Sequence, residues 1–267
     1  MPKELLPIID KPIIQFAVEE AAAAGIDTMV FVTGRSKRSV EDHFDSNFEL
    51  EHALISKGKD AEAQMVHDIV PPHVKCVFVR QAEQLGLGHA VLCAKPVVGE
   101  EPFAVLLADD FIVNKNGSFT KDMVQAYEAT GKSILCVEKV EDDQISKYGI
   151  ISPGKRNQEV GIDVRGIVEK PAPSNAPSNL ASYGRYVLDG EIFSILEQTK
   201  PGKGGEIQLV DAINILAEKG EVRALELDGT RYDCGDKLGY LQAITAVALQ
   251  SENFGADYRK FLNEIMK

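Results

Sequence analysis

Three short segments of this sequence carry charged side chains where a folded chain could use them for chemistry. The pair Asp109 and Asp110 follows an apolar run, and Asp233 stands just before Cys-Gly. Glu169 and Lys170 are adjacent and come before a proline-rich stretch. The three segments therefore offer two separated carboxylate sites and one carboxylate beside an ammonium. Such a set suits the binding of a magnesium ion, a phosphate and a polyhydroxylated ring at one edge of a sheet.

The aspartates are the candidates for holding a metal. Residues 103–107 are apolar at every position, which predicts a central strand buried on both faces. Open α/β sheets bind ligands at the carboxyl ends of their strands, where Asp109 would lie. Magnesium is usually held by one or two carboxylates together with substrate phosphates. Alternatively, the aspartate pair forms a turn that caps a helix, and Asp233 belongs to an ordinary turn before Cys234 and Gly235.

Glu169 and Lys170 are the candidates for binding a sugar phosphate. A carboxylate can accept two sugar hydroxyls, while a lysine offers a mobile positive charge to a phosphate. Strand-like residues come before this pair, and the Pro- and Ser-rich loop 171–179 follows it. The other interpretation is an exposed strand end that carries an ion pair.

A glycine-rich segment after a predicted strand is the candidate for binding a base. Gln81 comes before Gly86 and Gly88, and glycines at such a place let the backbone approach a ligand closely. A glutamine side chain can pair with the amide edge of a pyrimidine. Ordinary turn chemistry explains the glycines equally well. His89 is interpreted as a helix-start or packing residue rather than a catalytic base, and Lys3 alone would be a solvated charge.

The overall composition excludes several classes of protein. The formal net charge of −12 argues against a nucleic-acid partner, which is bound mainly by clustered Lys and Arg. The four cysteines are widely spaced, without a Cys-x-x-Cys, so neither a zinc site nor a disulfide framework is expected. No signal peptide or membrane span is recognisable. A reducing cytoplasm is the expected compartment.

Strand-like and helix-like stretches alternate in the first half, which predicts a sheet that is mixed but mostly parallel, with helices on both faces. Helices are expected over 12–24, 36–43, in the polar stretch up to residue 67, and over 87–95 and 118–130. Strands are expected over 29–33, 75–80, 103–107 and 133–140. The fold class is therefore α/β.

From about residue 149 the pattern changes. Strand-like pieces over 149–152, 160–168 and 182–188 are separated by Gly, Pro, Asn and Ser. Apolar residues then recur every three positions over 206–219, which predicts a helix, and 222–227 is strand-like. The remainder is expected to be largely helical. We expect one domain with a nucleotide-binding half (1–140), a β-rich sugar-binding half (141–235) and a helical tail (236–267).

Taken in order along almost the whole chain, the motifs resemble those of bacterial UTP–glucose-1-phosphate uridylyltransferases, also called UDP-glucose pyrophosphorylases. No single motif is specific for this family, but the occurrence of so many motifs in the same order is. The segments that carry the resemblance are Pro2-Lys3-Glu4-Leu5-Leu6-Pro7, Asp10-Lys11-Pro12, Gly86-Leu87-Gly88-His89-Ala90, Leu107-Ala108-Asp109-Asp110, Tyr148-Gly149-Ile150, Val168-Glu169-Lys170-Pro171, Ala176-Pro177-Ser178-Asn179-Leu180-Ala181, Gly184-Arg185-Tyr186, Gly205-Glu206-Ile207-Gln208-Leu209 and Tyr232-Asp233-Cys234-Gly235.

The resemblance implies a nucleotidyltransferase with a Rossmann-like core that makes UDP-glucose and pyrophosphate from UTP and glucose 1-phosphate, with Mg²⁺ as cofactor. By position, the implied catalytic residues are Lys3, Asp109, Lys170 and Asp233. Those implied for the nucleotide are Lys3, Glu4, Gln81 and Gly86. Those implied for the sugar phosphate are Gly149, Glu169, Lys170 and Gly184, and those for the metal are Asp109 and Asp233.

The sequence departs from this family at its start. Family members have a β-strand and a glycine-rich loop ending in Thr-Arg before the segment that matches Pro2-Lys3, whereas here Met1 precedes that segment directly. That loop would supply backbone amides to phosphates. We therefore expect the functional protein to be longer than this chain. For the chain as it stands, we expect weak UTP binding, an open sheet edge or a substituted strand, and little turnover.

Two alternatives and several partners complete the expectations. Another sugar-1-phosphate nucleotidyltransferase, such as a thymidylyl or guanylyl enzyme, would share most of the motifs. A catalytically impaired binding subunit would fit the missing loop. The expected partners are UTP, glucose 1-phosphate, UDP-glucose and pyrophosphate, with no nucleic acid and no membrane. The acidic helical tail and the family resemblance imply a homodimer or homotetramer.

Overall fold

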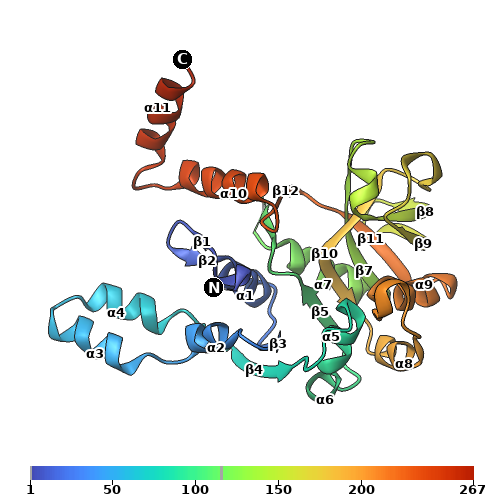
Figure 1. Cartoon of the computed structure of the whole chain (residues 1–267), viewed down its shortest axis with the longest axis horizontal. Coiled ribbons are helices and arrows are strands. Elements are labelled where there is room, and N and C mark those ends of the chain that lie inside the picture. The colour runs from blue at the N-terminus through green and yellow to red at the C-terminus, as the bar shows by residue number, and fades with distance from the viewer. Residues whose placement is uncertain (1, 115–116) are drawn as a thin grey trace.

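The computed structural model describes residues 2–114 and 117–267, so Met1 and residues 115–116 lie outside the described residues. Its main sheet has six strands in the order β5, β10, β7, β11, β9, β8, and helices cover both faces (Figure 1). This arrangement confirms the predicted α/β fold class. The six strands are β5 (Phe103–Leu106), β7 (Ser133–Lys139), β8 (Gly149–Asn157), β9 (Gly161–Glu169), β10 (Leu180–Leu188) and β11 (Val222–Glu226).

The main sheet is mixed, as predicted, but it is not mostly parallel. Among its described strands, β7 and β11 run parallel, and the other paired strands run antiparallel. One reason is that β8 and β9 form a hairpin, closed by a turn that ends at Gly161 with a φ of +83°. A hairpin returns the chain through a short turn, whereas a parallel pair needs a long crossover. The β-rich half therefore adds antiparallel pairs.

A separate parallel pair, β3 (Thr28–Thr33) and β4 (Lys75–Arg80), lies beside the main sheet. In the described part of the chain β5 pairs with β10 alone, and its side chains are half-buried. The prediction of a central strand buried on both faces is therefore wrong. The strand is apolar throughout because both of its faces contact apolar clusters: Val105 packs in one, while Ala104 and Leu106 pack in two others.

Two further strand pairs were missed in the sequence. β6 (Asp110–Asn114) pairs antiparallel with β12 (Gly229–Asp233), and β1 (Pro7–Ile8) pairs with β2 (Lys11–Pro12). β12 has the sequence Gly-Thr-Arg-Tyr-Asp, which offers no apolar alternation. The strand becomes apparent only through its pairing with β6, which runs from Gly229 opposite Asn114 to Asp233 opposite Asp110.

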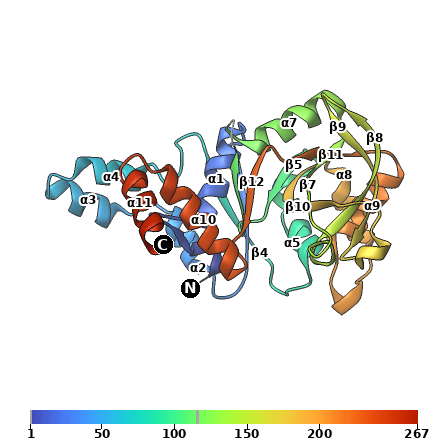
Figure 2. The same cartoon turned by 90° about the horizontal axis from the view of Figure 1, so that it is seen from above.

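The helices divide the molecule into two ends, as Figures 1 and 2 show from perpendicular directions. The helical hairpin of α3 and α4 lies at one end, and β8, β9, α8 and α9 lie at the other. The helices are α1 (Ile13–Ala23), α2 (Arg38–Phe44), α3 (Phe48–Ser56), α4 (Asp60–His67), α5 (Leu87–Cys93), α6 (Lys95–Val98), α7 (Phe119–Thr130), α8 (Glu191–Gln198), α9 (Leu209–Glu218), α10 (Lys237–Gln250) and α11 (Gly255–Ile265), with 3-10 turns η1 (Lys3–Leu5), η2 (Ile145–Lys147), η3 (Pro173–Asn175) and η4 (Lys203–Gly205).

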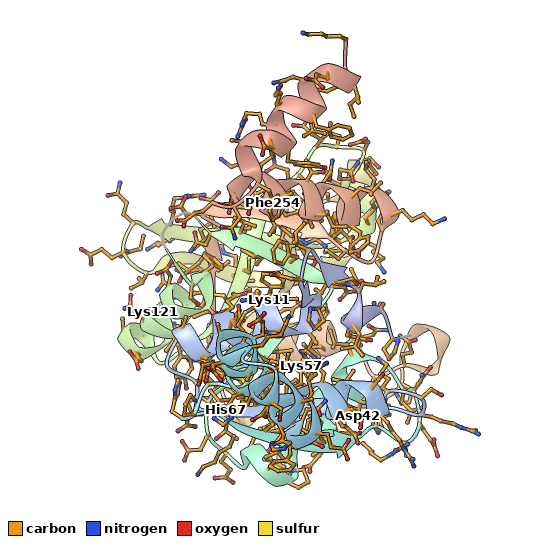
Figure 3. All side chains as sticks on the ribbon, turned by 90° about the vertical axis from the view of Figure 1, so that its left-hand side faces the viewer. Lys11, Asp42, Lys57, His67, Lys121 and Phe254 are labelled. Atoms are coloured by element: carbon orange, nitrogen blue, oxygen red, sulfur yellow. The ribbon has the colours of Figure 1, made fainter. Side chains whose placement is uncertain are left out.

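The last helix projects from the body of the molecule. In Figure 3, Phe254 marks the turn before α11, which rises above it, while Lys57 and His67 mark the α3–α4 hairpin lower down. Phe261 and Ile265 on α11 are exposed. No helix in the described residues is long and apolar enough to cross a membrane.

Alternation along the strands fills both faces of the main sheet. In β7, Leu135 and Val137 contact the core cluster that contains α5, α8 and α9, whereas Ile134 and Cys136 contact the cluster that contains α7. Successive side chains of a strand point to opposite faces, so one fully buried strand supports both cores. The segments with charged side chains are therefore positioned by a central sheet with helices packed on both faces.

Two predicted helices begin or end elsewhere than expected. The helix expected over 206–219 begins at Leu209, because the backbone of Ile207 bonds to the loop before α5: its N–H donates to Leu85 O at 2.7 Å and its O accepts from Gly88 N at 2.9 Å. The helix expected over 87–95 breaks at Ala94 and continues as α6. α8 was not predicted.

A buried ion pair anchors the segment that carries the two adjacent aspartates. Arg185 on β10 is 2% exposed, and its guanidinium binds Glu20 of α1 through Nη2 at 2.9 Å. The same guanidinium donates to the carbonyl oxygens of Leu107 at 3.0 Å and Asp110 at 2.8 Å. Arg185 therefore fixes the turn between β5 and β6 from beneath, and Glu20 supplies its balancing charge.

We expect Arg185→Met to lower the free energy of unfolding by roughly 3–5 kcal/mol, because it leaves the Glu20 carboxylate buried without its charge partner. Urea denaturation followed by circular dichroism measures this loss. The matched control is Glu62→Gln, which removes one partner of the exposed pair with Lys59 and should leave the unfolding midpoint unchanged. Equal midpoints for the two variants would contradict the anchoring role.

Candidate active site

Asp109 and Asp233, which we predicted to share a site, lie side by side. Asp109 occupies the turn between β5 and β6, and Asp233 is the last residue of β12. The N–H of Cys234 donates to the carbonyl of Asp109 at 2.8 Å. A Cβ placed on Gly235 would lie 3.0 Å from Asp233 Oδ1 and 3.3 Å from Asp109 Oδ2. Both carboxylates therefore border the same small space, which the absence of a side chain at 235 leaves open.

Lys3 reaches this space from the start of the chain. Its Nζ lies 2.5 Å from Asp109 Oδ2. Burial lowers the pKa of Lys3, but the hydrogen bond to Asp109 and the charges of Asp109, Glu4 and Asp233 outweigh burial, so the pKa ends above its ordinary value. The ammonium is therefore charged at neutral pH. Three segments far apart in the sequence thus bring one cation and two carboxylates together.

Asp110 differs from its neighbour in both burial and partners. It is 7% exposed, accepts from the N–H of Gly184 at 2.7 Å through Oδ2, and accepts from Arg231 Nε at 2.5 Å through Oδ1. A Cβ on Gly184 would lie 2.4 Å from Asp110 Oδ2, so only glycine fits there. The aspartate pair therefore splits into one half-exposed carboxylate beside Lys3 and one buried carboxylate that fastens strands together.

Arg231 joins this region to the β-rich half. Its guanidinium carbon lies 4.1 Å from the ring centre of Tyr183 and 5.1 Å from that of Tyr148, and Nη1 is 3.2 Å from the Tyr148 hydroxyl. It also approaches Asp233 Oδ2 at 3.4 Å. Burial lowers its pKa, but Asp110 and the Tyr148 hydroxyl raise it further, so the guanidinium stays charged. Cations over aromatic faces are attracted most where water is excluded.

Arg231 was not among the predicted site residues, although it stands two residues before Asp233. A strand prediction over 229–233 would have placed both side chains on the same face. Because apolar and polar residues do not alternate there, the strand was not predicted, and neither was the position of Arg231 beside Asp233.

Gly149, Glu169 and Lys170 come together at the start of β8. Gly149 is the register partner of Glu169, and a Cβ on Gly149 would lie 3.1 Å from Glu169 Oε2. Lys170 has a φ of +47°, donates its N–H to Tyr148 O at 3.0 Å, and places Nζ 3.6 Å from Glu169 Oε1. Both charged side chains are largely exposed. In the described residues, their link to the carboxylates of Asp109 and Asp233 runs through Tyr148 and Arg231.

Gln81 and Gly86 also meet, at the end of β4. Gln81 Nε2 donates to Gly86 O at 3.0 Å and lies 3.0 Å from His89 Nδ1. Gly86 has a φ of +93°, and a Cβ there would lie 2.9 Å from Ile207 O. Glycine is required on both counts, since L-residues rarely adopt this φ and no room exists for a side chain.

An apolar cluster holds the 3-10 turn that contains Lys3 and Glu4 near the end of β5. Leu5 and Leu106 both pack against the cluster that fills the space between α1, β3 and β4, so the 3-10 turn that carries Lys3 lies beside the end of β5. Glu4 Oε1 lies 2.6 Å from Lys37 Nζ, while its buried Oε2 has no hydrogen-bond partner among the described residues. An unsatisfied buried carboxylate oxygen is available to a donor on a ligand.

Comparison with known proteins shows the family to which the chain belongs. Residues 1–250 match the model of the family described as nucleotidyl transferase. The chain is 44% identical over 269 residues to the UTP–glucose-1-phosphate uridylyltransferase YngB of Bacillus subtilis, covering all of this chain and 89% of that protein. A protein of the same name from Escherichia coli K12 is 44% identical over 277 residues, with the same coverage. The chain belongs to the nucleotidyl transferase family.

Solved structures point to the same branch of the family. A UDP-glucose pyrophosphorylase of Acinetobacter baumannii superposes with a TM-score of 0.91 at 41% identity, over 99% of this chain and 92% of that one. A UDP-glucose pyrophosphorylase complexed with UDP-glucose superposes with a TM-score of 0.84 at 42% identity, over 94% and 92% of the two chains. The resemblance inferred from the ordered motifs is therefore confirmed.

The carboxylates of Asp109 and Asp233 are suitable ligands for a magnesium ion. Among residues 2–114 and 117–267, no group of three or more His, Cys, Asp or Glu side chains gathers as a complete metal site. Two carboxylates that border one open space are a partial oxygen donor set. Magnesium commonly takes such a set together with waters and substrate phosphates. The donors therefore fit a magnesium ion that arrives with a nucleotide.

A cavity of about 230 Å³ between α1, β6 and α10 is separate from this space. It is lined by apolar side chains such as Phe16 and by Asp110, Glu20 and Arg185. Each charged group already has a partner: Glu20 pairs with Arg185, and the Asp110 carboxylate binds Arg231. It is therefore part of the packing beneath the candidate site.

We expect the two adjacent aspartates to respond differently to the same substitution. Asp110→Asn should lower the free energy of unfolding by roughly 3–5 kcal/mol, because it leaves the buried Arg231 guanidinium without its strongest partner. Asp109→Asn, the matched control, should cost less than about 1 kcal/mol, because its pair with Lys3 is half-exposed. Urea denaturation measures both. A greater loss for Asp109→Asn would reverse the assignment of the two carboxylates.

Proposed function

We propose that this chain is an enzyme that transfers a uridylyl group from UTP to glucose 1-phosphate, giving UDP-glucose and pyrophosphate. The observation that carries the proposal is the meeting of Lys3, Asp109 and Asp233, which come from three separate motifs, around the space beside Gly235. Support comes from the relatives at 44% identity along the whole chain, whose names state this activity. One neighbouring structure is titled as bound to UTP and another as complexed with UDP-glucose.

In this proposal the first part of the chain, residues 1–140, binds the nucleotide. Lys3 binds its phosphates, Glu4 helps to place the nucleoside, and Gln81 with Gly86 contacts the uracil. Asp109 and Asp233 hold the magnesium. The unpartnered Oε2 of Glu4 and the close backbone at Gly86 support these assignments.

Residues 141–235 bind the sugar phosphate in the same proposal. Gly149 and Gly184 line the hexose, Glu169 accepts its hydroxyls, and Lys170 binds its phosphate. The exposure of the Glu169 and Lys170 side chains supports this, because they are open to a ligand. Gly184 is different: its close contact with Asp110 gives a structural reason for glycine there, so its part in binding is through its backbone.

The reaction follows from the charges. An oxygen of the sugar phosphate attacks the α-phosphorus of UTP, and the bond from that phosphorus to the pyrophosphate oxygen breaks. Both reactants are anions, and two like unit charges about 4 Å apart repel by about 4 kcal/mol at an effective dielectric constant of about 20. Lys3 and Lys170 counter this repulsion and hold the partners in line. Bound magnesium would neutralise charge on the nucleotide and on the departing pyrophosphate.

We also propose that the chain acts in the cytoplasm as a homodimer or homotetramer. Four free cysteines suit a reducing compartment. Exposed apolar side chains on the C-terminal tail, residues 236–267, support self-association: Leu238 is 62% exposed and Leu241 is 60% exposed. Sedimentation equilibrium tests this, and a monomer at micromolar concentration would contradict it.

The expected activity is pyrophosphate release that requires UTP, glucose 1-phosphate and Mg²⁺ together. We expect the double variant Asp109→Ala, Asp233→Ala to lose at least 100-fold in kcat/KM, on the order of the loss of one strong electrostatic contact to the transition state. Glu62→Gln, on the distant α4 helix, should retain full activity. A coupled pyrophosphate assay measures all three proteins.

Three outcomes would contradict the proposal or a part of it. Full activity of the double variant would refute the metal assignment. A higher kcat/KM for thymidine or guanosine triphosphate than for UTP would show a different member of the family. Binding of both substrates without pyrophosphate release would instead identify a binding subunit.

A further inference from the structure

The amide of Gln81 is held with both of its N–H groups already committed. Its Nε2 lies 3.0 Å from Gly86 O and 3.0 Å from His89 Nδ1. A backbone carbonyl can only accept a hydrogen bond, so the nitrogen end of the amide must face Gly86 whatever the state of the histidine. It follows that His89 Nδ1 accepts the second N–H and that the ring carries its proton on Nε2.

The two acceptors are themselves fixed in position. Gly86 is locked by the pairing of its loop with Ile207, as described above. His89 lies in the first turn of α5, where Val91 belongs to the buried core cluster. The backbone of Gln81 is tied to β3, because its N–H donates to Thr33 O at 2.8 Å. The amide therefore has little freedom to turn over.

One polar atom of this side chain is left over. Gln81 Oε1 has no hydrogen-bond partner among the described residues, and the side chain is only partly buried. This oxygen is an acceptor and cannot donate. A ligand that meets it must therefore bring an N–H or O–H group.

We propose that His89 is a positioning residue for base selection: by accepting from Gln81 Nε2 it keeps Oε1 turned toward the nucleotide as a fixed acceptor. The inference rests on the proposed function, in which Gln81 contacts the base. Uracil carries a hydrogen on N3 and can donate to this oxygen. Cytosine carries a lone pair on N3, which would face the lone pairs of Oε1. The pair of His89 and Gln81 thus favours UTP over CTP.

Removal of the histidine acceptor weakens this selection. Gly86 O alone then holds the nitrogen end of the amide, so turning the amide over to offer an N–H to N3 of cytosine breaks one hydrogen bond instead of two. Loss of a hydrogen bond of ordinary strength corresponds to roughly a 3- to 10-fold change in an equilibrium. We expect His89→Leu to lower the ratio of kcat/KM for UTP to kcat/KM for CTP by that factor. The change should appear in KM for UTP, with kcat nearly unchanged.

A conservative variant separates positioning from simple packing. In His89→Asn the side-chain Oδ1 stands near the position of Nδ1 and can accept the same N–H, so most of the selectivity should return. Cys93→Ala is the matched control, because Cys93 Sγ lies 4.0 Å from the same Nδ1 without touching Gln81. It should leave the ratio unchanged.

The experiment measures pyrophosphate release by the full chain and its variants with UTP or CTP, at saturating glucose 1-phosphate and Mg²⁺. Support is a lowered ratio in His89→Leu, restored in His89→Asn. An unchanged ratio in His89→Leu, or an equal loss for both nucleotides, overturns the inference while the proposed function stands. If His89→Leu does not fold, His89→Ala serves the same comparison. A wild-type chain that does not use UTP overturns the proposed function instead.

Discussion

The pairing of β6 with β12 is the constraint on which the candidate site depends. It joins segments more than a hundred residues apart in register, with Asp110 opposite Asp233. The buried contact of Arg231 with Asp110 fastens the two strands from within. Because Asp109 precedes one strand and Asp233 ends the other, this pairing alone sets the two carboxylates beside one space. Without it, both aspartates would belong to unrelated turns.

Arg231 also links the β6–β12 pair to the β-rich part of the molecule. Its guanidinium contacts the rings of Tyr148 and Tyr183, and Tyr148 O accepts the backbone N–H of Lys170. A buried charge that must keep its partners resists displacement more strongly than an apolar contact does, because leaving it unpaired is costly. Polar contacts that pass through Arg231 therefore link the candidate sugar-binding pair to the candidate metal ligands.

The extent to which the sequence predicted this arrangement follows from the kind of signal that each part carries. The meeting of Asp109 with Asp233 could be predicted, because the ordered motifs resemble those of a family in which both positions would hold one metal. The meeting of Gln81 with Gly86 could be predicted because glycines mark close backbone approach. The main sheet was expected to be mostly parallel, because the turn residues of the second half do not show which strands pair with each other. The antiparallel hairpin of β8 and β9 therefore could not be recognised from the sequence.

Other parts depend on contacts that no local pattern encodes. β12 has no apolar alternation, so its strand and Arg231 were invisible until β6 lay beside it. β5 is apolar because clusters pack on both of its faces. A central strand would have the same apolar sequence, so the sequence does not show where in the sheet the strand lies. His89 could be placed in a helix from the sequence, but not opposite Gln81. In each case the missing information is the identity of a distant partner.

The present partner of Asp109 has a consequence for the order of events in the proposed reaction. The Lys3 ammonium lies 2.5 Å from the carboxylate oxygen that also borders the space beside Gly235. Together, Lys3 and Arg231 carry one positive charge fewer than the three aspartates carry negative charges. A divalent cation would reverse this local balance and would compete with Lys3 for Asp109. Lys3 is exposed enough to move, and the arriving triphosphate offers it a more highly charged partner than the carboxylate it leaves. Exchange of one ion pair for another would let a metal and a nucleotide enter together without leaving a buried charge unpaired.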